Sequence, residues 1–225
     1  MPIDFDLEVW GNVVRLIRVT DKEVLGGSWA QHIFVPILYV DVSTPGGSDD
    51  AFGLGDVIVD PIVIGWHRGP WHWAAGLDVY LPVGDYDRDD LANTGRNYWT
   101  FEPVLACTYL NDEGCEVSAK FMYDINTEND DTDYESGDEF HFDYAVGKKM
   151  GDWTLGIGGF YYTQTTDDEG VGAPAGGNQG EQFAWGPQIS YQHKGMSFVL
   201  KYQQETQTEN KPEGERVWLK FITRL

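Results

Sequence analysis

Acidic, imidazole and phenol side chains recur at every second position in several stretches of the chain. In the segment 71–83, His72, Asp78 and Tyr80 share one side, while tryptophans and aliphatic residues dominate the other. Groups of these types on a common face can transfer protons, bind a metal ion or line a polar passage. Strict alternation with period two is typical of a β-strand with two different faces, so the chemistry depends on which face points inward.

Nucleophilic catalysis is not favoured by the placement of the candidate nucleophiles. No serine or cysteine falls with a histidine and an acid or amide on one face near the end of an expected strand. Cys107 and Cys115 lie in apolar rows without a neighbouring base. His72 and His141 fit better as members of a hydrogen-bonded network than as catalysts. The sequence therefore predicts a protein that is not an enzyme.

The two cysteines flank a tight turn in the sequence CTYLNDEGC. If Asn111–Gly114 form the turn, Cys115 pairs opposite Leu110. Cys107 then pairs opposite Ser118, and the two sulfurs are too far apart for a disulfide. We expect two free thiols, and two cysteines at this spacing do not make a metal site.

One acidic stretch, NDDTDYESGDE, resembles a calcium-binding loop in its alternate carboxylates at Asp131, Asp133 and Glu135. It lacks the glycine at the sixth loop position and the helical frame of such a site. A solvated acidic loop is the better interpretation, and we expect neither a metal nor a cofactor.

The overall charge excludes one large class of partners. Lysine and arginine number 15 against 37 aspartates and glutamates, which gives a formal net charge of −22. A basic surface for nucleic acid is therefore not expected. The longest apolar run, IFVPILYV, is far shorter than the roughly 20 residues of a membrane-spanning helix. The start, MPIDFDLEVW, does not show the basic segment followed by an apolar segment that marks an export signal. No linker divides the chain, so we expect one domain over residues 1–225.

Alternating segments separated by Gly-, Asp- and Asn-rich punctuation predict an all-β protein without helices. Connectors between them alternate in length from the third segment onward: HRGP, NDEG, KKMGD and HKG are short, and the connectors between these are long and mostly acidic. The expected strands cover about residues 4–19, 28–43, 54–66, 71–84, 97–110, 115–127, 139–148, 152–165, 181–193, 196–208 and 215–225.

Short turns at one rim and long loops at the other are typical of an outer-membrane barrel. Aromatic residues of the apolar rows gather near both strand ends, with aliphatic and small residues between them, as in the aromatic girdles of membrane barrels. A soluble core would concentrate its largest rings in mid-strand. We therefore expect the apolar rows, including both cysteines, to face lipid and the polar rows to face the lumen.

The predicted lumen mixes charged, aromatic and aliphatic groups, and a barrel of this size has a narrow interior. The lysines either pair with carboxylates and simply close the interior, or they select solutes; both interpretations stay open. We also expect Asp56, Asp60, Ile58, Ile62, Met122, Lys220 and Ile222 inside, with His32, Phe34, Pro36 and Leu38 as an apolar patch. The predicted solute path comprises His72, Asp78, Tyr80, Glu102, Lys120, Asp124, His141, Asp143, Phe160, Tyr162, Gln188, Lys201 and Trp218.

Several long phrases of the sequence are distinctive: GLGDVIVDPIVIGWH, WHWAAGLDVYLPVGDYD, GRNYWTFEPVLACTYL, FMYDINTEND, YESGDEFHFDYAVGKKMGDWTLGIGGFYY and PEGERVWLKF. These phrases resemble one known family, the outer-membrane channels known as phenol meta-pathway degradation proteins or transporters. The resemblance covers nearly the whole chain. It implies a transmembrane antiparallel up-and-down β-barrel of about twelve strands in a bacterial outer membrane, surrounded by lipid and lipopolysaccharide.

The same resemblance implies a function in the uptake of small hydrophobic or aromatic molecules. Because family members carry a signal peptide and further residues before the segment that matches Phe5 to Val19, we expect this chain to lack an N-terminal strand and the signal peptide. The last residue, Leu225, differs from the aromatic residue that usually ends such barrels. A structural barrel or a surface receptor acting through its acidic loops, and an enzymatic barrel, are the alternatives.

Overall fold

The computed structural model describes residues 5–224, which contain only β-strands and connections. No helix in this range is long and apolar enough to cross a membrane. The strands are β1 (Asp6–Val24), β2 (Gly27–Thr44), β3 (Gly47–Leu54), β4 (Val57–Arg68), β5 (Trp71–Leu81), β6 (Thr100–Leu110), β7 (Cys115–Asn126), β8 (Glu128–Asn129), β9 (Tyr134–Glu135), β10 (Glu139–Met150), β11 (Trp153–Gln164), β12 (Glu169–Gly170), β13 (Glu181–His193), β14 (Met196–Glu209) and β15 (Glu215–Ile222).

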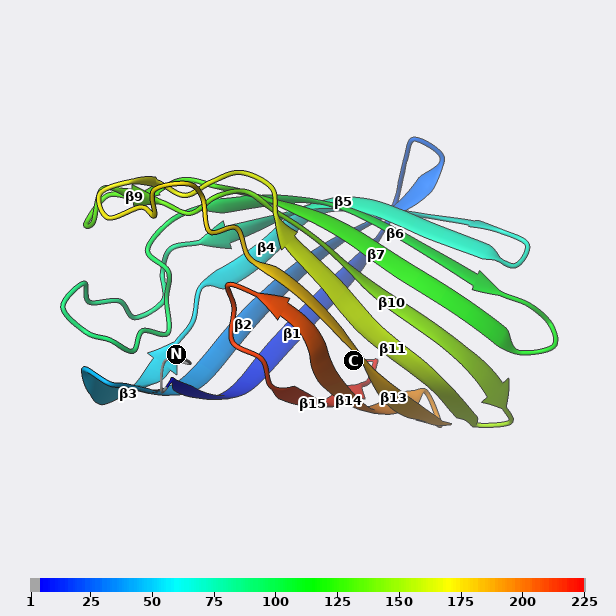
Figure 1. Ribbon diagram of the computed structural model, residues 1–225. Coiled ribbons are helices and arrows are strands. Elements are labelled where there is room, and N and C mark those ends of the chain that lie inside the picture. The colour runs from blue at the N-terminus through cyan, green and yellow to red at the C-terminus, as the bar shows by residue number, and fades with distance from the viewer. Residues whose placement is uncertain (1–4, 225) are drawn as a thin grey trace.

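One antiparallel sheet contains all the long strands in the order β1-β2-β4-β5-β6-β7-β10-β11-β13-β14-β15. The sheet is strongly curved, and its strands are tilted and joined mainly to their sequence neighbours (Figure 1). These eleven strands coincide with the eleven predicted segments to within a few residues, which confirms the all-β antiparallel class. No pairing joins β1 to β15 within residues 5–224. The expected additional strand stays a prediction.

The sequence did not predict β3. This strand and β4 run one after the other along the same edge of β2: β3 pairs with residues 37–44, and β4 with residues 28–34. The segment GSDDAFGL combines glycine and aspartate, which are rare in strands, so its alternation is weak. Pairing with the long strand β2 nevertheless holds it in the sheet.

Short and long connections are sorted to opposite ends of the curved sheet, as the sequence indicates (Figure 1). Each predicted short turn carries a glycine with positive φ, for example 58° at Gly69 and 82° at Gly195. Glycine tolerates this backbone conformation without a steric penalty, which explains why the turns close over so few residues. At the other end, β8, β9 and β12 form a small separate sheet from the acidic loops.

Burial along the strands is inverted relative to a soluble protein. The side chain of Glu102 is 1% exposed, and Thr100 and Asp78 are also buried. In contrast, Leu105 is 54% and Ile157 52% exposed near the middle of their strands. An exposed apolar exterior around a buried polar interior is what a lipid-surrounded barrel requires. The apolar rows therefore face outward, as predicted.

A bulge corrects one predicted interior residue. Asp60 and Pro61 interrupt the β4–β5 register between Val59 and Ile62. The extra residue reverses the facing of the rest of the strand, because side chains alternate with period two. Ile62 therefore pairs with outward-facing Leu77 and is 52% exposed, so the prediction that it lines the lumen is wrong.

The β6–β7 hairpin has a different register from the predicted one. Leu110 pairs with Glu116, and Cys107 pairs with Ala119, each one residue further along β7 than expected. The cause is a longer connection, in which the Asn111 N–H donates to the carbonyl of Cys115. This register places outward residues opposite outward residues, and both thiols are free.

The long connection over residues 82–99 is anchored to the sheet rather than free. Asp56 accepts hydrogen bonds from the backbone N–H groups of Gly84 and Arg96, at 3.0 and 2.8 Å. Gly84 and Gly95 lie so close that a Cβ on either would fall within 2.9 Å of the other's backbone. The connection also reaches the neighbouring acidic loop, since Asn97 donates to Asp131. Part of that loop is thus structured, and its likeness to a calcium site gains no support from these contacts.

Candidate functional site in the barrel interior

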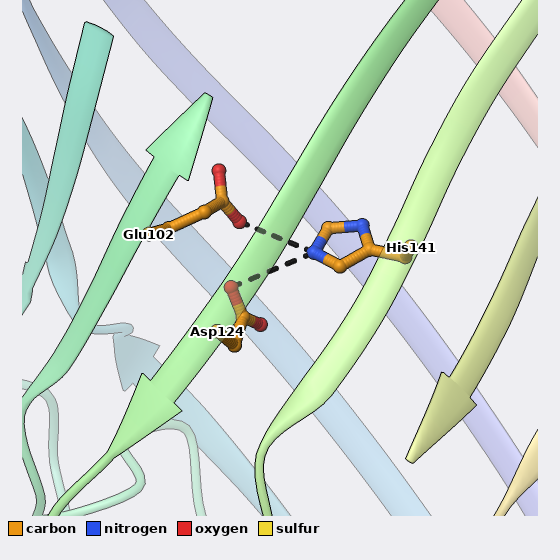
Figure 2. A group of neighbouring side chains, drawn as sticks. All are labelled: Glu102, Asp124 and His141. Atoms are coloured by element: carbon orange, nitrogen blue, oxygen red, sulfur yellow. Dashed lines mark ion pairs between the residues drawn. The ribbon is translucent and has the colours of Figure 1, made fainter. Parts of the chain in front are cut away.

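A buried cluster of two carboxylates and one imidazole occupies the inner face of three neighbouring strands. Glu102 belongs to β6, Asp124 to β7 and His141 to β10 (Figure 2). The imidazole Nε2 lies 3.2 Å from Glu102 Oε2 and 3.5 Å from Asp124 Oδ1. The alternation of each strand turns these three side chains inward, and the antiparallel pairing brings them together diagonally, since Asp124 stands opposite Glu139, two residues before His141.

The cluster extends along the wall toward β5. The Tyr80 hydroxyl donates to Glu102 Oε2 at 3.2 Å. The Lys120 ammonium lies 3.8 Å from Glu102 and 3.7 Å from Asp78. These contacts place positive groups among three buried carboxylates, which reduces the energetic cost of burying their charge.

Three of these side chains could in principle meet one metal ion. Glu102, Asp124 and His141 each offer a ligand atom, and these atoms lie within 4.8 Å of one another. Two carboxylates and one imidazole are suitable donors for several divalent metals. The ammonium group of Lys120, 3.8 Å from Glu102, would oppose a cation at this position electrostatically. The contacts among these residues are accounted for as an ion-pair network.

Two further acidic residues on this wall have their own nitrogen-bearing partners. Asp60 Oδ2 lies 2.7 Å from His32 Nδ1, and Asp56 Oδ2 lies 3.8 Å from Arg96 Nε. The Arg96 guanidinium also packs over the ring of Tyr80, 4.8 Å from its centroid. The segment containing His32 is therefore not the purely apolar inner patch that its sequence suggested.

The opposite part of the interior, formed by β10, β11, β13, β14 and β15, encloses a cavity of about 320 Å³. Its lining combines aromatic rings with cationic side chains. The Lys211 ammonium lies 3.4 Å from the centroid of the Tyr162 ring, and the Arg216 guanidinium lies 4.5 Å from that of Phe160. The full lining is His141, Asp143, Phe160, Tyr162, Gln182, Lys201, Gln203, Lys211, Arg216, Trp218 and Lys220.

The thirteen residues of the predicted solute path fall into two groups and two separate positions. Asp78, Tyr80, Glu102, Lys120, Asp124 and His141 form the acidic cluster. Asp143, Phe160, Tyr162, Lys201 and Trp218 line the cavity, which His141 also borders.

The two separate positions are those of His72 and Gln188. His72 pairs with His67 beside a short turn, where their Nδ1 atoms are 2.6 Å apart. Gln188 stands opposite Lys201 on β14, and its buried Oε1 has no hydrogen-bond partner within the described residues. Neither residue contacts the cluster, so any part they have in a solute path stays a prediction.

Sequence reasoning missed the arginines and one lysine of the interior. Arg216 follows the inward alternation of its strand and could have been found, whereas Arg96 and Lys211 come from loops, where alternation gives no direction. Arg216 Nε donates to Glu205 Oε1 at 2.7 Å. Lys211 lies in the connection before β15, and burial lowers the pKa of its ammonium group.

One tyrosine of the small loop sheet is also held in a protein environment. The Tyr134 hydroxyl on β9 donates to Asp168. Burial, together with this contact to a carboxylate, raises the pKa of Tyr134 to about 12, because both disfavour the phenolate.

The curved antiparallel sheet, its polar interior and its exposed apolar exterior define an outer-membrane β-barrel. The chain belongs to the family described as "Putative MetA-pathway of phenol degradation", whose model matches residues 1–221. This match confirms the family resemblance.

A solved structure supports the same fold. The chain resembles the crystal structure of an outer membrane channel from Pseudomonas putida F1, with a TM-score of 0.82 and 19% sequence identity; the match covers 97% of this chain and 84% of that one. No curated protein sequence matches. The predicted barrel class and its location in the outer membrane agree with these findings.

Proposed function

We propose that the protein is an outer-membrane channel through which small hydrophobic or aromatic molecules enter the cell. The observation that carries this proposal is the cavity of about 320 Å³ inside the barrel, into which Phe160, Tyr162 and Trp218 present aromatic rings. A wide aqueous pore for polar nutrients gains nothing from such rings, whereas an apolar solute can exchange water for their faces.

The acidic cluster supports the proposal from the other wall. Its carboxylates each lie within 4.0 Å of a lysine, arginine or histidine nitrogen, so a solute passing this wall meets few isolated charges. The contacts within the cluster also join inward side chains of neighbouring strands. A constricted interior that combines ion-paired carboxylates with aromatic faces fits a selective passage.

Two alternatives make different predictions. A structural barrel or a receptor acting through its loops would pass no solute. An enzymatic barrel would convert a solute at an interior proton-transfer group, and His141, which borders the cavity, is the candidate for such a group. The non-enzymatic function stays a prediction, which a permeation measurement can test.

The test is swelling of liposomes that contain the purified barrel. An aryl glycoside and a disaccharide of similar size are compared, because neither crosses lipid readily and only one carries an aromatic ring. We expect the aryl glycoside to enter faster. Phe160→Ala and Tyr80→Ala should reduce this advantage, because they remove interior rings.

Phe101→Ala is the matched control, since Phe101 faces outward on β6 and is 39% exposed. It should leave both rates unchanged. Equal entry of the two solutes would indicate a general pore, and entry of neither would indicate a structural or receptor barrel. Either result would overturn the proposal.

A further inference from the structure

The positive charges of the interior are distributed unevenly between its two walls. On the wall formed by β4–β7, each buried carboxylate that faces the lumen has a lysine, arginine or histidine nitrogen within 4.0 Å. On the wall formed by β10–β15, the only ion pair between described residues is Arg216 with Glu205. His141 of β10 contacts the acids of the first wall, but within the described part of the chain the lysines of the second wall form no ion pair with them.

Three lysines line the cavity without an ion-pair partner among residues 5–224. Lys201 on β14, Lys220 on β15 and Lys211 in the loop before it all border the same space, and the salt bridges of the described chain include none of them. Asp143 is the single carboxylate of the lining. The nearby carboxylate of Glu139 accepts a hydrogen bond from Tyr162, at 2.6 Å. The cavity thus has an excess of positive charge.

The same cations lie against aromatic faces. Lys211 packs on Tyr162, Arg216 on Phe160, and the Lys220 ammonium lies 5.7 Å from the centroid of the Trp218 ring. Trp218 is also paired with Lys201 in the β14–β15 ladder, so two lysines flank this ring. An anionic group can therefore reach an ammonium group while an attached ring reaches an aromatic face.

We propose that this cavity is a binding site for small aromatic anions, with the anionic group at Lys201 and Lys220 and the ring against Trp218 and Phe160. The inference rests on the proposed function as an aromatic-solute channel and specifies the charge of the preferred solute. The overall charge of −22 does not oppose it, because exposed acidic loops are screened by salt over about 8 Å at physiological ionic strength.

The experiment measures permeability ratios from reversal potentials in planar bilayers. Three ions are compared: benzenesulfonate, an aromatic anion; methanesulfonate, an aliphatic anion; and phenyltrimethylammonium, an aromatic cation. We expect benzenesulfonate to be the most permeant, by about fivefold over the aromatic cation, which is the size of one favourable half-exposed charge contact.

Substitution of the two lysines tests the site directly. The double variant Lys201→Gln with Lys220→Gln should lose the preference for benzenesulfonate over phenyltrimethylammonium, and Lys201→Arg should retain it. Lys194→Gln, in the short turn between β13 and β14, removes one lysine at a distance from the cavity and should change nothing. Heat-modified electrophoretic mobility establishes that each variant is folded.

The outcomes separate this inference from the function on which it rests. If both aromatic ions pass equally well and faster than methanesulfonate, the aromatic channel stands and the anion site is wrong. An anion preference that survives the double substitution would also overturn the site. If the aromatic ions have no advantage over methanesulfonate, the proposed function itself fails.

Discussion

His141 on β10 contacts Glu102 on β6 across the intervening strand β7, with Nε2 3.2 Å from Oε2. Asp124 of β7 lies beneath this contact and completes the cluster. The imidazole therefore links three strands through side chains, in addition to their backbone hydrogen bonds. It also contacts two buried carboxylates that would otherwise repel each other.

Removal of that imidazole should destabilise the barrel. His141→Ala leaves Glu102 and Asp124 buried side by side without their shared partner, and we expect a loss of about 3 to 5 kcal/mol in the free energy of unfolding. Urea unfolding in liposomes measures the loss. His72→Ala, beside a short turn, is the control and should cost much less. Similar losses in the two variants would show that the cluster contributes no more to the free energy of unfolding than a residue beside a short turn.

The orientation of the strands predicts a strong asymmetry in tolerance to charge. Leu105→Arg places a guanidinium on the exposed apolar exterior and should cost roughly 2 to 4 kcal/mol of stability in bilayers. Ser118→Arg on the inward row should cost much less, since Ser118 faces the polar interior and bonds Thr108. The same unfolding assay applies. Equal costs would contradict the inverted arrangement of polar and apolar faces.

The close approach of Gly84 and Gly95 should control how the connection 82–99 is held. A Cβ at Gly95 would lie 2.7 Å from the Gly84 carbonyl carbon, so Gly95→Ala should release the connection. Trypsin cleavage after Arg88 then becomes faster. Gly46→Ala, where the nearest atom is the Thr44 hydroxyl at 3.6 Å, should leave the cleavage rate unchanged. An unaltered rate in Gly95→Ala would mean that the connection tolerates a wider separation.

The loop sheet should show a late tyrosine titration. The pKa of Tyr134 is raised to about 12 from an ordinary value of 10.0, so the unfolded chain ionises first as pH increases. The stabilising effect of the neutral phenol is therefore complete below about pH 10 and is lost between about pH 10 and 12.

The difference in absorbance at 295 nm between the protein and its Tyr134→Phe variant isolates this group. We expect a midpoint near pH 12, and a lower midpoint in the Asp168→Asn background, because a charged neighbour is removed. A midpoint near pH 10 in the unmodified background would refute the buried hydrogen bond to Asp168.

Alternation made most of the fold predictable, because a period of two both marks a strand and assigns its faces. It failed where the chain leaves that period. The bulge at Asp60 turned Ile62 outward, and the longer turn after Leu110 shifted a hairpin register by one residue. The strand β3 was missed because its glycines and aspartates are typical of loops.

The residues of the site were predictable only where strand alternation determines the direction of a side chain. Glu102, Asp124 and His141 follow the inward parity of their strands, but parity does not show that they come into contact; the register between strands determines that. Arg96 and Lys211 reach the interior from loops, and no periodic signal applies to them. The register between strands likewise determines that, among the residues described, the carboxylates of one wall form ion pairs while the lysines Lys201 and Lys220 of the other wall do not.

The central claim is that solutes pass through the barrel interior, and modification of an interior cysteine tests it most directly. In a background with Cys107→Ser and Cys115→Ser, Asp143→Cys places a thiol in the cavity, and Val146→Cys places one on the exterior of the same strand, where Val146 is 54% exposed. Single-channel conductance is recorded before and after a water-soluble thiol reagent. The account predicts that the reagent lowers the conductance of Asp143→Cys and leaves that of Val146→Cys unchanged. An absence of conductance, or an unchanged conductance after confirmed modification of Asp143→Cys, would contradict it.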